Sequence, residues 1–346
     1  MHDQPIPKVQ DLRPKTSGLG PKTYPNWQAA LADAVTDPAE LARLLRLPAP
    51  AATRGDCESS QFPMLVPRPY VARIRAGDPA DPLLLQVLPS GEELVATPGF
   101  SHDPLAETDA LQEPGLLAKY ASRVLMVTTG ACAVHCRFCF RRHFPYQEAV
   151  ATSRRWEPAL ARIAADPSIR EVILSGGDPL TLTDARLQRL VDRLALIPNL
   201  SRLRVHTRLP IVIPQRVTPG LLACLRGRLT TWMVLHVNHA AEIDAAVAEA
   251  LGRLVDAGIP LLSQSVLLRG VNDRVEVLAE LFERLADLRV VPYYLHQLDR
   301  VAGAAHFHVP ETTGIELMAA LRARLPGYMV PRYVRETVGE PNKKIL

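Results

Sequence analysis

Short apolar runs recur from residue 124 to residue 295, and they constrain the fold more than any other feature of the sequence. From residue 203 onward they begin about 30 residues apart, the length of one strand followed by one helix. The runs cover residues 124–128, 171–174, 203–206, 231–237, 260–267 and 290–295. Amphipathic helical stretches lie between them. This alternation predicts an α/β fold with a covered parallel sheet. Six repeats are too few for a closed eight-stranded barrel, so we predict a partial, TIM-like (β/α)6 barrel or an open twisted sheet.

The N-terminal third lacks this period. Apolar residues at helical spacing predict one helix over residues 26–47, and a proline-rich stretch of mixed signals follows it. We therefore predict a mixed, partly helical N-terminal extension over residues 1–115. The barrel is expected over residues 116–325, and a separate C-terminal segment over residues 326–346.

Composition restricts the class of protein. The chain has 346 residues, of which 47% are hydrophobic and 22% charged, and its net charge is +4. This balance excludes a disordered chain, and so mild a charge gives no reason to expect a nucleic acid or a membrane as partner. The early prolines and charges predict that there is no signal peptide, and no apolar run reaches the roughly 20 residues of a membrane span. We therefore expect a cytoplasmic protein.

Three of the five cysteines lie within eight residues of one another. Five is too few and odd for a disulfide scaffold, but Cys132, Cys136 and Cys139 follow the first predicted strand and can converge on one metal centre. The alternatives are zinc completed by a neighbouring histidine, and a four-cysteine cluster completed by Cys224. The lack of a second Cys-x-x-Cys pair and of a nearby fourth thiol favours an iron–sulfur cluster with one open iron.

Polar residues also stand at the ends of the later predicted strands. Parallel strands end at the same edge of a sheet, where functional sites gather. The residues are a Ser-Gly-Gly-Asp run at 175–178, His206, His236, Gln264 and His296. Caps, turns and satisfied core histidines are the structural alternative, but the density of these residues predicts a site.

The cysteine spacing, with an aromatic residue before the third cysteine, resembles the radical S-adenosylmethionine superfamily. The resemblance implies a barrel of that type and a [4Fe-4S] cluster whose open iron binds S-adenosylmethionine. One electron then cleaves this cofactor to a radical. Glycines at the end of the second strand fit, because they allow a backbone to approach a ligand closely. The positions that match the superfamily's S-adenosylmethionine contacts are Phe138, Ser175, Gly176, Gly177, Asp178, His236 and Gln264.

Four further segments resemble lysine 2,3-aminomutases, namely residues 141–146, 264–273, 292–296 and 303–307. The likeness runs from about residue 27 onward, and it points to the bacterial subgroup that supplies β-lysine for the modification of elongation factor P. It implies an isomerase that converts L-α-lysine to β-lysine. It also implies an electron donor such as flavodoxin or ferredoxin, and an elongation factor P ligase that takes the product. A homo-oligomer is left open.

The aminomutases also use pyridoxal 5′-phosphate, so a lysine must form its Schiff base. The segment Gly-Glu-Pro-Asn-Lys at residues 339–343 resembles the family's lysine-bearing segment, which implies Lys343 as that catalytic lysine. The neighbouring Lys344 and an ordinary surface role are the alternatives. The residues that resemble the family's phosphate-contacting segment are Lys119, Tyr120 and Arg123.

Charged residues at the matching family positions indicate which kind of amino acid the protein binds. Arg141 matches the family position that binds the substrate carboxylate, with the adjacent Arg142 as alternative. Asp299 and Glu336 match the positions that hold the ammonium group of lysine. Two acids there would repel the side chain of glutamate, whereas arginine is not excluded. A radical enzyme acting on another amino acid, or a non-catalytic iron–sulfur or zinc protein, is the alternative function.

Overall fold

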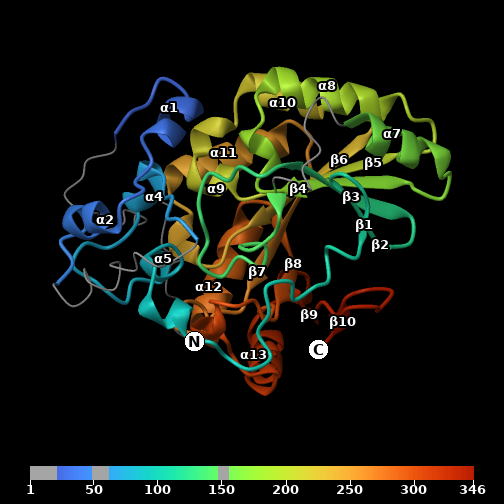
Figure 1. Ribbon diagram of the computed structural model, residues 1–346. Coiled ribbons are helices and arrows are strands. Elements are labelled where there is room, and N and C mark those ends of the chain that lie inside the picture. The colour runs from blue at the N-terminus through green and yellow to red at the C-terminus, as the bar shows by residue number, and fades with distance from the viewer. Residues whose placement is uncertain (1–21, 49–61, 147–155) are drawn as a thin grey trace, which may run out of the picture.

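One sheet organises the part of the chain that the computed structural model describes, which is residues 22–48, 62–146 and 156–346. Within these residues ten strands lie side by side in chain order (Figure 1). Neighbouring strands from β3 to β9 are parallel, whereas β1, β2 and β10 pair antiparallel with their neighbours. The strands are β1 (Leu111–Glu113), β2 (Leu116–Tyr120), β3 (Arg123–Thr129), β4 (Glu171–Gly176), β5 (Arg202–Thr207), β6 (Thr230–His236), β7 (Leu261–Val266), β8 (Val290–His296), β9 (Arg332–Arg335) and β10 (Lys344–Ile345).

The strands from β3 to β8 are the six predicted repeats, and each begins within one residue of its predicted start. The sheet stays open, because the strand order runs from β1 at one edge to β10 at the other. The predicted α/β fold with a partial barrel is therefore confirmed. The prediction lacked β9, which adds a further parallel strand beside β8. Its four residues, Arg-Tyr-Val-Arg, carry too short an apolar signal to be recognised in the sequence.

Helices cover the outer face of the parallel strands (Figure 1). In α8 the four apolar residues at helical spacing are all buried, and this helix packs against α10, while α12 packs against β8 and α13. In the described residues no helix is both long and apolar enough to cross a lipid bilayer. The helices are α7 (Trp156–Ala165), α8 (Asp184–Ala195), α9 (Leu209–Val212), α10 (Pro219–Leu225), α11 (Ala245–Asp256), α12 (Val275–Asp287) and α13 (Glu311–Arg324).

The single helix predicted over residues 26–47 is wrong, because the structure has two helices there, α1 (Trp27–Ala32) and α2 (Pro38–Leu44). Proline has no amide hydrogen and is tolerated only in the first turn, so Pro38 starts a new helix, with Asp37 as its cap. Between the helices Val35 leaves the helical path and pairs with Val66 in an isolated bridge.

The rest of the described N-terminal part consists of short helices. They are α4 (Arg68–Val71), α5 (Pro82–Leu85) and the 3₁₀ turn η3 (Gly91–Leu94). The division of the chain at residues 115 and 325 stays a prediction. The sheet itself crosses both positions, since β1 pairs with β2 and β9 with β8.

The C-terminal segment is held by strand pairing. After β9 the chain turns at Gly339, whose φ of +83° favours glycine, and returns as β10. Lys344 lies opposite Arg335, and Ile345 lies opposite Val334. This hairpin fixes the segment that carries Lys343 at the edge of the sheet.

Candidate active site

The cysteine loop follows β3 and rests on the N-terminal part of the chain. The backbone amide of His135 donates to the Leu65 carbonyl at 3.0 Å, and that of Arg137 donates to the Gln86 carbonyl at 2.9 Å. The buried Arg137 guanidinium also donates from Nε to the buried Glu93 carboxylate at 2.8 Å. The described N-terminal segment therefore supports the loop, a role that the sequence left open.

The three thiols of this loop are free and half-buried. Burial raises the pKa of Cys132 and Cys139, that of Cys139 to about 11, so binding of a metal centre would have to displace their protons. Arg208 donates from Nη1 to the Sγ atom of Cys136 at 2.7 Å. Cys224 is buried in α10, where its thiol faces a backbone carbonyl, so a fourth ligand from that position is not supported.

The described residues contain no three His, Cys, Asp or Glu side chains that converge on the position of a single metal ion. A tetrahedral zinc site requires such convergence at about 2.3 Å from each sulfur. A four-iron cluster distributes its thiolates over separate irons. The choice of an iron–sulfur cluster over zinc at this loop stays a prediction from the sequence.

The turn after β4 lies directly against the start of the cysteine loop. The amide of Gly177 donates to the Thr129 carbonyl at 2.7 Å, and that of Asp178 donates to the Ala131 carbonyl at 2.8 Å. Gly176 has a φ of +125°, and a Cβ atom on Gly177 would collide with the Ala131 carbonyl. Both glycines are therefore required by the close approach of two backbones. The fold brings the predicted Ser-Gly-Gly-Asp run beside the cysteines.

The Asp178 carboxylate is occupied by protein donors. It accepts from the Thr207 hydroxyl at 2.7 Å and from the backbone amides of Leu180, Arg208 and Leu209 at 3.0, 2.8 and 3.0 Å. Burial raises the pKa of this carboxyl group, and the hydrogen bonds oppose that effect. Asp178 thus joins the ends of β4 and β5. Its carboxylate oxygens are engaged by protein donors, and the predicted contact of Asp178 with S-adenosylmethionine stays a prediction.

Imidazole rings line the carboxyl ends of β5, β6 and β8. The amide nitrogen of Gln264 lies 2.7 Å from Nε2 of His236. Burial lowers the pKa of His236 and His296 to about 3, so both rings are neutral at pH 7. The Nε2 atoms of His206 and His296 are buried and have no hydrogen-bond partner among the described residues. A buried polar atom without a partner costs about 1–3 kcal/mol, so these two nitrogens mark a place that a polar ligand would satisfy.

Phe138 packs into a small apolar cluster beside this edge. Its ring meets Phe307 edge to face at 6.2 Å between centroids, and it packs against the cluster that includes Leu268 and Leu298. The Arg208 guanidinium lies 5.7 Å from the centroid of the ring. The predicted contact of Phe138 with S-adenosylmethionine stays a prediction.

Lys343 lies in a cluster of charged side chains with Glu336 and Lys119. Its Nζ atom pairs with Oε2 of Glu336 and lies 5.9 Å from the ring centroid of Tyr120. Lys119 reaches Oε1 of the same glutamate at 3.1 Å. The side chain of Lys344 is exposed and forms no ion pair with described residues. Of the two adjacent lysines, the structure therefore brings Lys343 into the site.

The predicted phosphate-contacting residues gather around this lysine. The Arg123 guanidinium lies 4.5 Å from the ring centroid of Tyr120, and Lys119 lies on the neighbouring part of β2. Because Glu336 follows β9, the Lys119–Glu336 pair connects the two edge regions of the open sheet. Figure 1 shows β1–β2 and β9–β10 on the same side of the molecule.

The two predicted ammonium-binding acids have opposite electrostatic surroundings. Burial and the nearby Glu336 charge raise the pKa of Asp299 to about 7. Burial would also raise the pKa of Glu336, but Lys343 and Lys119 outweigh it and lower that pKa to about 2. Glu336 is therefore an anion already neutralised by lysines, whereas Asp299 gains its charge only near neutral pH.

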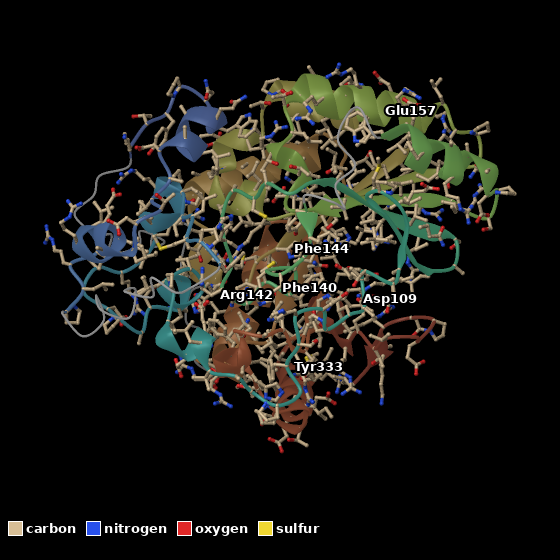
Figure 2. The ribbon with its side chains drawn as sticks, viewed as in Figure 1. Asp109, Phe140, Arg142, Phe144, Glu157 and Tyr333 are labelled. Atoms are coloured by element: carbon tan, nitrogen blue, oxygen red, sulfur yellow. The ribbon has the colours of Figure 1, made fainter. Side chains whose placement is uncertain are left out.

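Arg141 is buried and held by a residue that the sequence did not reveal. Its Nε and Nη2 atoms donate to the two carboxylate oxygens of Glu107 at 2.6 and 2.8 Å. Burial would lower the pKa of Arg141, but Glu107 outweighs it and raises that pKa above the usual value. The rings of Phe140 and Phe144, near the centre of the view in Figure 2, flank the guanidinium at 4.9 and 5.9 Å from their centroids. Its Nη1 atom donates to the Ser175 hydroxyl at 3.1 Å.

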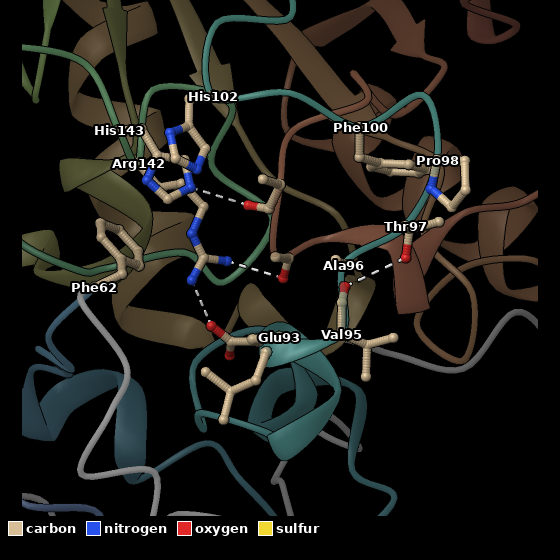
Figure 3. A pocket seen from close by; sticks show the side chains of 13 residues that line it. Phe62, Glu93, Val95, Ala96, Thr97, Pro98, Phe100, His102, Arg142 and His143 are labelled. Atoms are coloured by element: carbon tan, nitrogen blue, oxygen red, sulfur yellow. Dashed lines mark hydrogen bonds and ion pairs between the residues drawn. The ribbon is translucent and has the colours of Figure 1, made fainter.

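Arg142 points away from this site. Its guanidinium donates to the Glu93 carboxylate and to the Gly303 carbonyl, at 2.5 and 2.9 Å. It lines a cavity of about 660 Å³ together with residues of the N-terminal segment, including Phe62 and His102 (Figure 3). This cavity contains none of the residues predicted to bind cofactors or substrate. The alternative assignment of the substrate carboxylate to Arg142 is therefore not supported.

The fold thus brings most of the predicted residues into one region, from the cysteine loop to Lys343. Sequence reasoning missed Glu107 and Arg208 because their roles depend on long-range contacts. Glu107 lies in an irregular segment without a motif, while Arg208 follows β5, a position that could have drawn attention to it.

Comparisons with known proteins identify relatives of the chain. The chain is 48% identical to the L-lysine 2,3-aminomutase of Escherichia coli strain K12, over 93% of this chain and 94% of that protein. It is 45% identical to the L-lysine 2,3-aminomutase of Haemophilus influenzae, over 92% of this chain and 95% of that protein. The enzyme of the same name from Clostridium subterminale is 40% identical, over 79% of this chain and 66% of that protein.

Two other comparisons add little. No family model matches the chain. The crystal structure of Streptococcus suis SuiB bound to S-adenosylmethionine aligns with a TM-score of 0.46 and 14% identity, over 67% of this chain and 54% of that one. That level of similarity does not establish a common fold. The identities above extend over nearly the full length of two relatives, so the chain belongs to the L-lysine 2,3-aminomutase family.

Proposed function

We propose that the chain is an L-lysine 2,3-aminomutase that converts L-α-lysine to β-lysine with an iron–sulfur cluster, S-adenosylmethionine and pyridoxal 5′-phosphate. The observation that carries the proposal is the pairing of Lys343 with Glu336, with the protonatable Asp299 beside them. A lysine that can bind an aldehyde cofactor thereby lies within reach of two acids that can bind a substrate's ammonium group. Membership of the family supports the same conclusion.

The residues present fit an iron–sulfur cluster, S-adenosylmethionine and pyridoxal phosphate. The cysteine loop offers thiols suited to a cluster, and the glycine turn packs directly against the start of that loop. The unpartnered Nε2 atoms of His206 and His296 offer hydrogen-bonding capacity beside the site. Lys343 is the candidate for covalent attachment of pyridoxal phosphate, and Lys119 and Arg123 are candidate partners of its phosphate. When bound, the cluster with S-adenosylmethionine supplies a hydrogen-abstracting radical, and pyridoxal phosphate supplies the carbonyl group that carries the migrating nitrogen.

The protein side chains bind and orient the substrate. Arg141 can hold the α-carboxylate, because a buried guanidinium binds carboxylates in a fixed geometry. Glu336 and Asp299 can hold the ammonium group at the far end. An arriving ammonium would favour the charged form of Asp299, so binding of lysine would release a proton near pH 7. Burial of these groups excludes water, which strengthens each interaction.

The charges of Asp299 and Glu336 also favour some candidate substrates over others. The far carboxylate of glutamate would meet two acids, and burial together with the charge of Glu336 already raises the pKa of Asp299. Lysine and arginine both carry a cation at that end, so the acids favour either over glutamate. We propose lysine as the substrate because of the family, and arginine is the competitor to be tested.

Anaerobic reconstitution with iron, sulfide, pyridoxal phosphate, S-adenosylmethionine and a reductant tests the proposal. L-lysine, L-arginine and L-glutamate are offered in turn, and products are separated by chromatography with an authentic β-lysine standard. We expect β-lysine from lysine alone. The Lys343→Ala variant should form no product, while the matched Lys344→Ala variant should remain active. Zinc in stoichiometric amount with no iron, or turnover of arginine only, would refute the assignment.

The partners are part of the proposal. A low-potential donor such as flavodoxin or ferredoxin would reduce the cluster in the cytoplasm, where thiols stay reduced. The product would pass to a ligase that modifies elongation factor P. The support for this step is the likeness of the sequence to the corresponding bacterial subgroup. A pull-down of the two proteins followed by β-lysine transfer in vitro would test it.

A further inference from the structure

Glu107 lies between two cations of the site. Its carboxylate binds the side edge of Arg141 through two hydrogen bonds, at 2.6 and 2.8 Å, and lies 3.5 Å from Nζ of Lys119. Only 3% of the residue is exposed to solvent. Its own backbone amide donates to the Asp103 carboxylate at 2.9 Å, which fixes the segment that carries it. A buried carboxylate held at this many points is a rigid support.

The hydrogen bonds of the Arg141 guanidinium show which of its N–H groups remain free to bind a ligand. A guanidinium has five N–H donors. Nε and one hydrogen of Nη2 are taken by Glu107, while Nη1 faces the Ser175 hydroxyl and the Gly176 carbonyl, at 3.1 and 3.4 Å. One Nη2 hydrogen has no partner among the described residues. Glu107 therefore occupies the side edge of the guanidinium, and the second Nη2 hydrogen, which lies at the end edge, is the donor left for a ligand.

We propose that Glu107 is a positioning residue that aims the free Nη2 hydrogen of Arg141 at the carboxylate of the amino-acid substrate. This inference rests on the proposed function, since it concerns the same binding site. Glu107 belongs to the N-terminal part of the chain, so that part supplies a determinant of substrate binding as well as support for the cysteine loop. The alternative is that Glu107 competes with the substrate carboxylate for Arg141. The two readings predict opposite effects of removing its charge.

The test measures ligand binding to the protein loaded with pyridoxal phosphate, through the absorbance change of that cofactor when an amine is added. L-lysine is compared with 1,5-diaminopentane, which is lysine without its carboxylate. In Glu107→Gln we expect the dissociation constant for lysine to rise roughly 10- to 100-fold, the range for loss of a hydrogen bond to a charged group. The constant for 1,5-diaminopentane should change less than about twofold, because that ligand does not use Arg141.

Two further variants keep the test decisive. Glu107→Asp retains the charge and should restore part of the lysine affinity, and it serves if Glu107→Gln fails to fold in a thermal melt. Glu93→Gln is the matched control, because Glu93 is likewise a buried carboxylate that pairs with arginines of the same loop, Arg137 and Arg142. The ratio of the two dissociation constants should stay at the wild-type value in Glu93→Gln.

Each outcome decides the proposal. A tenfold rise confined to lysine supports positioning by Glu107. Equal weakening of both ligands, tighter binding of lysine, or the same shifted ratio in Glu93→Gln would overturn it. A wild-type protein whose cofactor absorbance does not respond to lysine would refute the proposed function and this inference with it. A normal wild-type response with an unchanged ratio in Glu107→Gln and Glu107→Asp would refute only the role of Glu107.

Discussion

Replacing Asp299 with asparagine should stabilise the cofactor-free protein, and increasingly so as the pH rises. The pKa of this carboxyl group is raised from 3.8 to about 7 by burial and by Glu336. Between these pH values the folded state keeps a proton that the unfolded state has lost, so the free energy of unfolding falls by about 1.4 kcal/mol per pH unit and levels off above pH 7. Asparagine removes this penalty. From pH 5 to pH 8 the advantage of the variant should grow by roughly 3 kcal/mol.

Thermal unfolding of wild type and Asp299→Asn, measured by circular dichroism across this pH range without cofactors, checks the prediction. For a chain of this length, 3 kcal/mol corresponds to about 4 °C in the melting midpoint. Glu336 does not interfere, because its lowered pKa places its titration below this window. Asp256→Asn is the control, since Asp256 is exposed and its pair with Arg289 is screened by solvent. A difference between wild type and Asp299→Asn that is flat from pH 5 to pH 8, or that falls, would refute the reasoning.

Two further substitutions and one labelling experiment test other parts of the site. Gly177→Ala should lower the free energy of unfolding by roughly 1–3 kcal/mol in a denaturant titration, because a Cβ atom meets the Ala131 carbonyl, while Gly227→Ala, with open space around it, should not. Cys136→Ala should abolish iron incorporation in an iron assay and leave the far-ultraviolet circular dichroism spectrum unchanged, and normal iron content would contradict the role of the loop. Borohydride reduction with pyridoxal phosphate should label Lys343 on peptide mapping, and labelling of the neighbouring lysine alone would reverse the assignment.

The repeated core of the fold could be predicted because its signal is local and periodic. Each of the strands β3 to β8 combines an apolar run with a helix that covers it, so residues such as Val172 and Leu203 reveal their burial through their neighbours. β9 could not be predicted in this way, because it is four residues long and has arginine at both ends. The break between α1 and α2 was visible in Pro38, but the helical spacing on both sides concealed it.

The residues of the site likewise fall into those that the sequence predicts and those that it does not. Motif residues such as Cys136 and Lys343 were identified from spacing and resemblance, because these features survive in the linear sequence. The roles of Glu107 and of the contacts between Asp178 and the end of β5 were not, since each depends on groups more than 25 residues away in the chain. Charge balance in a buried site is a property of the assembled fold. The neutralisation of Glu336 by two lysines therefore had no signature in the sequence.

The contact between Arg208 and Cys136 has a consequence for electron transfer. The guanidinium donates to the Cys136 sulfur and also to Gln86 and Glu242, at 2.7, 2.7 and 2.8 Å, so its position is fixed from three sides. A cation that donates to a ligand sulfur stabilises added negative charge, which raises the reduction potential of an iron–sulfur cluster held there. Since Gln86 belongs to the N-terminal segment, that segment would help to set how strong a reductant such a cluster needs.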